Sequence, residues 1–157
     1  MLRLGLALAI LVLALDQVSK GWVLSSLMQP PRVIEVTSFF NFVLVWNRGI
    51  SFGLLGSGSM TQAWILAAFG TIVAGGLLVW LHRAALPRLP SLGVGLIVGG
   101  ALGNVVDRLR FGAVVDFLDL HAGGWHWPAF NVADSAITVG VAALVLDAVL
   151  RDGRENP

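Results

Sequence analysis

The sequence predicts an all-α membrane protein of four transmembrane helices with a small β-rich element at one membrane face. Of its 157 residues, 57% are apolar and only 12% are charged, whereas a soluble domain usually has roughly 25% charged residues. Four long apolar segments are separated by connections, two of which are rich in strand-forming residues or turn signals. Because strands in lipid would leave backbone groups unpaired, these two connections must lie outside the hydrocarbon core.

We expect spans at about residues 4–24, 61–81, 90–109 and 132–150, because a helix needs roughly 20 mainly apolar residues to cross a bilayer. Only the second segment is free of charge throughout, so the polar ends of the other three must lie in the interface or face protein. The first segment resembles a secretory signal, but it has no small-residue cleavage site before Asp16 and three spans follow it. We therefore interpret it as a retained first helix.

The β-rich element is expected at about residues 25–60. After two prolines, residues 32–46 are rich in β-branched and aromatic side chains, which favour strands. A second non-helical connection, residues 110–130, contains a Gly-Gly turn and two tryptophans. With four spans, both connections lie at the same membrane face, and we expect residues 1–157 to form a single membrane domain.

Residue counts exclude several kinds of site. The chain has no cysteine, so it has no disulfide, no thiolate metal site and no cysteine nucleophile. Its three histidines form no ligand-spaced cluster, so we expect no metal and no cofactor. The formal net charge of +1 gives no electrostatic footprint for nucleic acid. A Ser–Lys nucleophile is disfavoured because Lys20 is the only lysine and its neighbour Ser19 points about 100° away on a helix.

The informative residues are ionisable and amide side chains near the ends of the spans, all at the face of the β-rich element. A charge at membrane depth costs about 2.5–3.5 kcal/mol on insertion scales, so such residues normally face a bundle interior or a polar cavity. They are Asp16 and Lys20 in the first span, Asn104, Asp107 and Arg108 at the end of the third, Asp116 just beyond it, and Asn131 and Asp134 at the start of the fourth.

Taken singly, these groups also have structural interpretations. Asp16 and Lys20, four residues apart, can form a pair that reaches the membrane interface. Asp134 can be an acid that stabilises the start of a helix, with Asn131 as its N-cap. Both interpretations stay open at the level of the sequence.

Other polar groups and a glycine stripe are interpreted as structural. Asp107 and Arg108 can close the third helix as an ion pair. Asp119 is expected to be a solvated loop acid, because in an extended segment it points away from the face of Asp116. Three glycines spaced four apart predict close helix packing of the small-xxx-small type; they are Gly95, Gly99 and Gly103.

Asp116 and Asp134 together predict a two-carboxylate site. Two neighbouring carboxyl groups do not ionise together readily, so one keeps a proton while the other acts as a base. A water between them can lose a proton to one aspartate while the other donates to a carbonyl oxygen. This pair therefore predicts peptide hydrolysis without a metal or a covalent intermediate.

Five sequence blocks resemble those of the lipoprotein signal peptidase (signal peptidase II) family, in the family's order and over nearly the whole chain. They are DQVSK (16–20), NRGISF (47–52), GGALGNVVDR (99–108), VVDF (114–117) and FNVADS (130–135). The resemblance implies a bacterial inner-membrane aspartyl endopeptidase of four helices with a periplasmic β-rich cradle. It implies a catalytic dyad of Asp116 and Asp134. The residues that it implies to support or line the site are Asp16, Lys20, Asn47, Gly49, Asn104, Asp107, Arg108, Asn131 and Ala133.

The same resemblance implies the partners and the orientation. The substrate would be a prolipoprotein whose lipobox cysteine carries diacylglycerol, cut just before that cysteine, and globomycin-type cyclic peptides would inhibit. The active site would face the periplasm and both termini the cytoplasm; the basic residues divide five to five between the two faces, so the positive-inside rule does not decide this. Arg48 and the stretch 123–127 would bear on substrate preference.

Two functions of other classes are weighed against the peptidase. A small proton- or ion-coupled carrier would also place aspartates in membrane helices. Four spans without an internal repeat, and acids gathered at one face rather than at the midplane, argue against it. A non-enzymatic binding subunit, with the β-rich element as its docking surface, is the other alternative.

Overall fold

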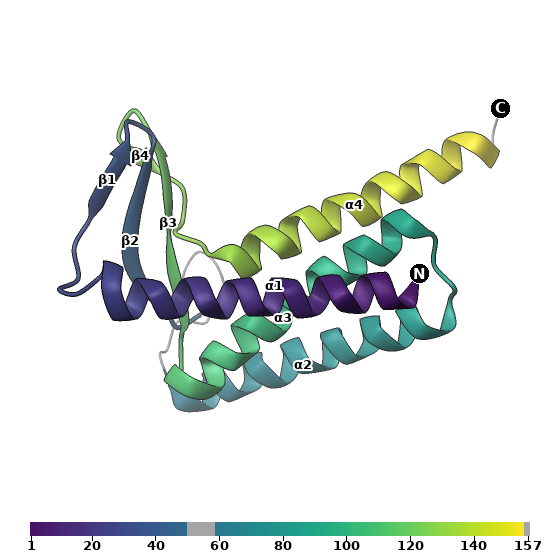
Figure 1. The fold of residues 1–157 in the computed structure, drawn as a ribbon, viewed down its shortest axis with the longest axis horizontal. Coiled ribbons are helices and arrows are strands. Elements are labelled where there is room, and N and C mark those ends of the chain that lie inside the picture. Colours follow the sequence, from purple (N-terminus) through teal and green to yellow (C-terminus); the bar gives the residue numbers. More distant parts are fainter. Residues whose placement is uncertain (50–58, 156–157) are drawn as a thin grey trace.

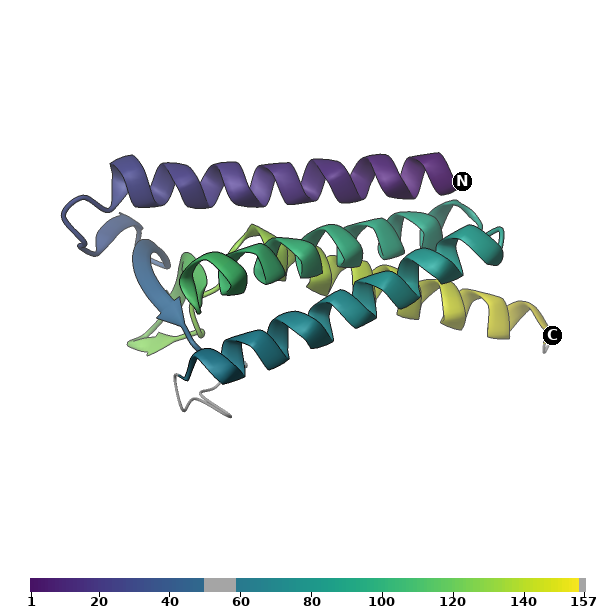
Figure 2. The same cartoon turned by 90° about the horizontal axis from the view of Figure 1, so that it is seen from below.

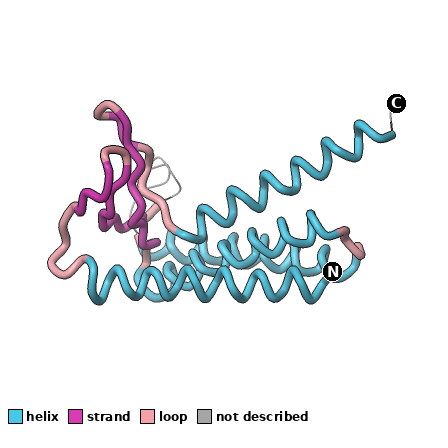
Figure 3. Tube along the Cα trace, turned by 45° about the horizontal axis from the view of Figure 1, so that its top comes forward, coloured by secondary structure: helices cyan, strands magenta, loops and turns pink. Residues whose placement is uncertain are grey.

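The computed structural model describes residues 1–49 and 59–155, with side chains to residue 151. Four helices are long and apolar enough to cross a membrane: α1 Leu2–Trp22 with its π-helical extension η1 Val23–Leu27, α2 Met60–Arg83, α3 Arg88–Phe111 and α4 Val132–Glu155. The four helices and a small antiparallel sheet confirm the predicted fold class. The sheet lies at one end of the bundle and both chain ends lie at the other (Figures 1 and 3).

The helix α3 is the centre of the bundle and contacts each of the other three helices. Figure 2 shows it between α1 on one side and α2 and α4 on the other. The predicted glycine stripe lies on its face toward α1 and allows the two backbones to approach closely. A Cβ added at Gly95 would lie 2.5 Å from the Gly5 carbonyl oxygen, and one at Gly103 would lie 2.5 Å from Oδ2 of Asp16. The last contact places Asp16 directly against α3.

The sheet joins the two non-helical connections of the chain. Its strands are β1 Ile34–Thr37, β2 Phe40–Asn47, β3 Val114–Ala122 and β4 Trp125–His126, paired in the order β1-β2-β3-β4. The expected β-rich segment 25–60 supplies β1 and β2, and its residues 50–58 lie outside the described residues. The other two strands come from the connection between α3 and α4.

Three glycines turn the chain, one from α3 into β3 and two from β3 into β4. Gly112 ends α3 with a φ of +69°, and its N–H donates to the Arg108 carbonyl oxygen at 3.0 Å. Gly123 and Gly124 have φ values of +57° and +82° in the β3–β4 turn. Side chains with a Cβ rarely adopt this left-handed region. These turns place β3 beside β2, with Asp116 opposite Val45 and Asn47 opposite Val114.

Candidate active site

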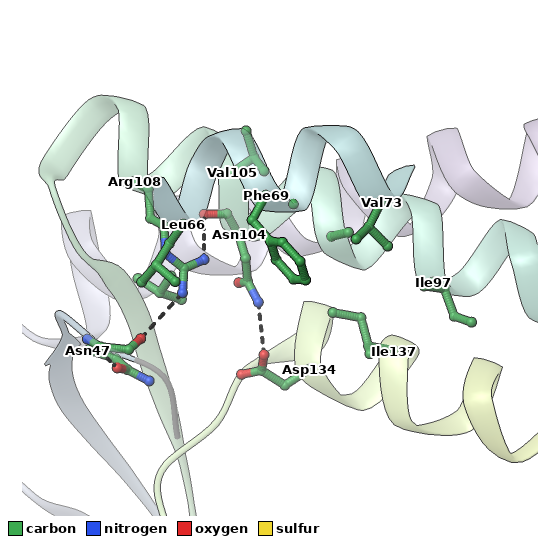
Figure 4. Close-up of a pocket in the computed structure, with 14 residues that line it drawn as sticks. Asn47, Leu66, Phe69, Val73, Ile97, Asn104, Val105, Arg108, Asp134 and Ile137 are labelled. Carbon is green, nitrogen blue, oxygen red and sulfur yellow. Dashed lines mark hydrogen bonds between the residues drawn. The ribbon is translucent and has the colours of Figure 1, made fainter. Parts of the chain in front are cut away.

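The two predicted catalytic aspartates face one group of asparagine side chains from two different elements. Asp116, the third residue of β3, is 1% exposed, and its carboxylate accepts hydrogen bonds from Asn131 Nδ2 at 2.7 Å and from Asn47 Nδ2 at 2.9 Å. Asp134, in the first turn of α4, accepts a hydrogen bond from Asn104 Nδ2 at 2.8 Å (Figure 4). Each carboxylate is therefore held in a fixed orientation by neutral amide donors.

Asn131 and Asp134 also cap the start of α4. The Asp134 N–H donates to Asn131 Oδ1 at 2.9 Å, and the Asn131 N–H donates to Asp134 Oδ2 at 3.3 Å. This reciprocal pair is the arrangement of a capping box. The interpretation of Asp134 as a helix-start acid is therefore correct, and the same capping geometry aims its other carboxylate oxygen at Asn104.

A buried cluster of charges stands behind the asparagines. Lys20 Nζ lies 2.8 Å from Asp16 Oδ2 and 2.9 Å from Asp107 Oδ2, and all three side chains are excluded from solvent. Asp16 Oδ1 accepts a hydrogen bond from the Ala133 N–H at 2.9 Å, and Asp107 Oδ2 accepts one from the Val115 N–H at 3.0 Å. The two carboxylates thus hold the backbone of the residues immediately before each predicted catalytic aspartate.

Burial changes the interpretation of two pairs. The alternative in which Asp16 and Lys20 form a pair at the membrane interface is wrong, since the pair lies between helices with almost no exposed surface. The alternative in which Asp107 pairs with its neighbour Arg108 is also wrong, because Asp107 pairs with Lys20 of α1 instead. Adjacent residues on a helix point about 100° apart, so Asp107 faces α1 while Arg108 faces the sheet side.

Lys20 also orients the amide group of Asn104. Asn104 Oδ1 accepts hydrogen bonds from Lys20 Nζ at 3.1 Å and from Asn131 Nδ2 at 3.3 Å. With its oxygen occupied on that side, the NH₂ group of Asn104 is directed at Asp134. Lys20 of α1 therefore orients Asn104 of α3, which in turn donates a hydrogen bond to Asp134 of α4.

Arg108 connects α3 to the end of β2. Its guanidinium donates to the Asn104 carbonyl oxygen at 3.3 Å and to the Gly49 carbonyl oxygen at 3.4 Å (Figure 4). The Gly49 N–H in turn donates to Asn47 Oδ1 at 3.1 Å, which leaves the NH₂ group of that asparagine for Asp116. Arg48 is exposed, and residues 50–52 of the predicted NRGISF block lie outside the described residues.

The hydrogen-bonded network includes every residue that the sequence predicted for the site, and one that it missed. Gln17 Nε2 lies 3.0 Å from Asp107 Oδ1, 3.2 Å from Asp16 Oδ2 and 3.2 Å from the Gly103 carbonyl oxygen. Gln17 thus donates to both carboxylates that flank Lys20. Its position beside Asp16 in the DQVSK block could have indicated a place in the site. The sequence does not show how α1 is rotated, and therefore does not show that Gln17 faces α3.

Two cavities meet at Asp134. The first, of about 300 Å³, lies between α2, α3 and α4 and is lined mainly by apolar side chains such as Phe69, Val73 and Ile137 (Figure 4). The second, of about 530 Å³, lies between α4 and the chain that follows β4, with Trp127 in its wall. Asn47, Asp134 and Ile137 line both cavities. Asp134 therefore lies on the wall that the two cavities share.

Asp116 has the electrostatics of a carboxyl group that exchanges a proton near neutral pH. Burial, and then the negative charge of Asp134, raise the pKa of Asp116 to about 7. The hydrogen bonds from Asn47 and Asn131 and the charge of Lys20 act in the opposite direction but do not compensate. A group with such a pKa is half protonated at pH 7, which suits it to general acid–base chemistry.

Asp119 is not the solvated loop acid that the sequence suggested. It is 6% exposed and lies inside β3, which continues to Ala122. Its Oδ2 accepts a hydrogen bond from Asn41 Nδ2 at 3.0 Å, and His126 Nδ1 lies 3.0 Å from both of its oxygens. The expectation failed because the Gly-Gly turn folds β4 back over β3, which covers Asp119 with His126.

Comparisons with known proteins agree with these observations. A family model described as Signal peptidase (SPase) II matches residues 8–150. The lipoprotein signal peptidase of Azoarcus sp. (strain BH72) is 51% identical over 152 residues, which are 97% of this chain and 85% of that protein. The lipoprotein signal peptidase of Methylobacterium radiotolerans is 48% identical over 155 residues, 98% of this chain and 90% of that protein.

Solved structures of similar fold are described as bacterial membrane enzymes. One matches with a TM-score of 0.82 and 32% identity, covering 98% of this chain and 91% of that chain. Another matches with a TM-score of 0.79 and 33% identity, covering 94% of this chain and 93% of that chain. The similarity therefore extends over the bundle and the sheet together.

Proposed function

This chain belongs to the signal peptidase II family, and from that premise we propose that it removes the signal peptide from prolipoproteins by cutting just before the diacylglyceryl-modified cysteine. It is a multi-pass membrane protein and an aspartic peptidase. The observation that carries the proposal is the pair of carboxyl groups, Asp116 and Asp134, brought from two elements to one set of asparagines. The pKa of Asp116, which is raised to about 7, also supports this proposal.

The reaction uses the aspartate pair as one unit. A water held between the carboxyl groups loses a proton to the ionised aspartate while its oxygen attacks the scissile carbonyl carbon. The protonated aspartate donates to the carbonyl oxygen, which gives a tetrahedral intermediate. When the C–N bond breaks, the abstracted proton passes to the departing amine, and a hydroxyl of the intermediate returns its proton to the other aspartate, which restores the singly protonated pair. The pair shares one proton through the cycle, so its titration belongs to the pair rather than to either residue.

The supporting residues keep the two carboxyl groups in position. Asn131 donates to Asp116 and caps the helix of Asp134, so one side chain sets the position of both. Lys20 pairs with Asp16 and Asp107, and these two carboxylates accept hydrogen bonds from the backbone just before each catalytic aspartate. A site held within a fraction of an ångström is what efficient proton transfer requires.

We assign the substrate to the two cavities that meet at Asp134. The apolar lining of both suits a signal helix and the acyl chains of a lipidated cysteine arriving from the bilayer. Globomycin-type cyclic peptides would compete for the same space beside the dyad. Membrane lipid contacts the outer faces of α2 and α4, where large apolar side chains are exposed.

The orientation follows from the substrate. Lipidated precursors emerge on the periplasmic side of the bacterial inner membrane, so the sheet end of the bundle faces the periplasm. Four spans then place both termini in the cytoplasm. A C-terminal alkaline phosphatase fusion is expected to be inactive, and an active periplasmic fusion would show that this orientation is wrong.

The carrier alternative is not favoured. Asp16, Asp107, Asp116 and Asp134 all lie at the sheet end of the bundle, whereas coupling sites of carriers lie near the bilayer midplane. Purified protein in detergent should cleave a diacylglyceryl-modified precursor and leave the unlipidated precursor intact. Binding of the lipidated precursor without cleavage would contradict the proposed reaction.

A further inference from the structure

Exposed aromatic side chains gather where the β3–β4 hairpin lies beside the turn between β1 and β2. Phe39, Trp125 and Trp127 are 57%, 61% and 52% exposed, and the two indole rings meet edge to face at 5.7 Å. With Leu120 they line a shallow groove between the hairpin and the β1–β2 turn. We call these four residues the aromatic ridge. None of them carries a charge, and none donates or accepts a proton in the proposed reaction.

The aromatic ridge is continuous with a surface of α4. Leu120 and Trp127 line the groove on the hairpin and also the larger cavity beside α4, whose wall includes Thr138 and Val139. Val139 is exposed on a helix that is apolar enough to span the membrane. In Figure 1 the β3–β4 hairpin projects from the end of the bundle on the same side as α4. The aromatic ridge therefore extends a membrane-spanning surface beyond the end of the bundle.

Polar contacts inside the hairpin hold the aromatic ridge in place. The backbone N–H of Trp127 donates to the Leu120 carbonyl oxygen at 2.8 Å, next to the contacts of Asp119 with Asn41 and His126. Asp119 thereby ties β3 to both of its neighbouring strands. The aromatic side chains are thus presented on a preformed surface and need little ordering when they bind.

We propose that the aromatic ridge inserts into the headgroup region of the phospholipid leaflet beside α4, with Asp119 as the buried residue that holds it there. Tryptophan is enriched at this depth, because its ring is apolar and its N–H group can still reach water or headgroups. The larger cavity then opens from Asp134 directly to lipid. This anchoring requires only a bundle that spans a membrane, and it does not depend on which substrate is cleaved.

The absence of cysteine makes the insertion measurable, because each introduced cysteine is unique. The full chain carrying Trp125→Cys is labelled with a nitroxide and reconstituted in vesicles of phosphatidylethanolamine and phosphatidylglycerol. We expect its label to collide several-fold more with oxygen than with an aqueous nickel complex. Matched controls are Val139→Cys on α4, which should behave in the same way, and Val36→Cys, an exposed apolar position on β1 that lines neither groove and should behave as aqueous.

Three results would overturn the proposal. The label at position 125 could behave like the aqueous control at position 36. Its shielding could appear only at high protein-to-lipid ratio, which would assign the ridge to a second copy of the chain. It could also appear only after a precursor peptide is added, which would assign the ridge to substrate. Quenching of the native tryptophans by brominated phospholipid, reduced in Trp125→Ser/Trp127→Ser, checks the insertion without a label.

Discussion

Asp116 and Asp119 lie three residues apart on the same strand, and their surroundings act on them in opposite ways. Both are almost fully buried, and both accept hydrogen bonds from two side chains. Burial and the negative charge of Asp134 raise the pKa of Asp116 to about 7. Burial also acts to raise the pKa of Asp119, but the hydrogen bonds from His126 and Asn41 outweigh it and lower the pKa below its usual value.

The difference shows that burial and hydrogen bonding do not by themselves make a carboxyl group reactive. Asp119 faces an imidazole that can carry a positive charge, so it stays ionised and holds strands together. Asp116 faces a second carboxyl group, that of Asp134, so the pair retains a proton near neutral pH, as general acid–base catalysis requires. The sign of the nearest titratable partner separates a structural aspartate from a catalytic one on this strand.

The largest expected effect is on turnover when either member of the pair loses its carboxyl group. Asp116→Asn and Asp134→Asn should each lower turnover by several orders of magnitude, because an amide cannot accept the proton of the attacking water. Groups that act as a unit are non-additive, so the double variant should be hardly worse than either single one. Single-turnover cleavage of a diacylglyceryl-modified precursor measures this, and binding of the precursor should largely survive.

Asp119→Asn is the matched control for that experiment, since it makes the same substitution on the same strand. It should keep its rate constant for cleavage close to the parent value while weakening the hairpin and raising the apparent KM. A loss in the cleavage rate equal to that of Asp116→Asn would mean that the catalytic pair is misassigned.

The next effect in size concerns Lys20, which stabilises the ionised form of Asp116 from a distance. Lys20→Met removes the single cation between Asp16 and Asp107. Breaking a buried ion pair by removing one partner costs about 3–5 kcal/mol, so the thermal unfolding midpoint in detergent should fall clearly. Arg151→Met, which breaks the solvent-facing pair with Asp147, should leave the midpoint almost unchanged.

The pH dependence of cleavage tests whether the active form of the Asp116–Asp134 pair carries one proton. The profile of kcat/KM should be bell-shaped, because both fully protonated and fully ionised pairs are inactive. The alkaline limb should lie near pH 7, as the pKa of Asp116 requires. In any Lys20→Met protein that folds, this limb should move to higher pH. A limb unchanged by that substitution would contradict the coupling between Lys20 and Asp116.

The sequence was sufficient for the fold class because long apolar segments and five blocks in family order mark the helices and the site. It was not sufficient for the contacts between helices. That Asp107 pairs with Lys20 and not with Arg108 depends on how α1 and α3 are rotated against each other, and no spacing within one segment shows this. The error at Asp119 has the same origin, since His126 reaches it only after the hairpin folds back.

The smallest expected effect is on the pH dependence of stability, and it should have opposite signs for the two aspartates. Asp116 has a raised pKa in the folded state, so the folded protein binds more protons than the unfolded chain between about pH 4 and pH 7. Its contribution to stability therefore falls as pH rises through that range and is constant above it. Asp119 has a lowered pKa when folded, so its contribution is present above the unfolded pKa and is lost as pH falls toward the folded one.

Replacing each aspartate by asparagine should therefore change the dependence of stability on pH in a different pH range. Asp116→Asn should flatten the decline toward neutral pH, with a net gain on the order of 1 kcal/mol at pH 8, since the amide also gives up one of the hydrogen bonds that the carboxylate accepts. Asp119→Asn should instead lower stability at neutral pH and flatten the acid side. Unfolding midpoints in detergent between pH 4 and pH 8 measure both profiles. If the two variants shift the profile in the same direction, the opposite surroundings of these aspartates do not control their protons, and the distinction between Asp116 as catalytic and Asp119 as structural loses its physical basis.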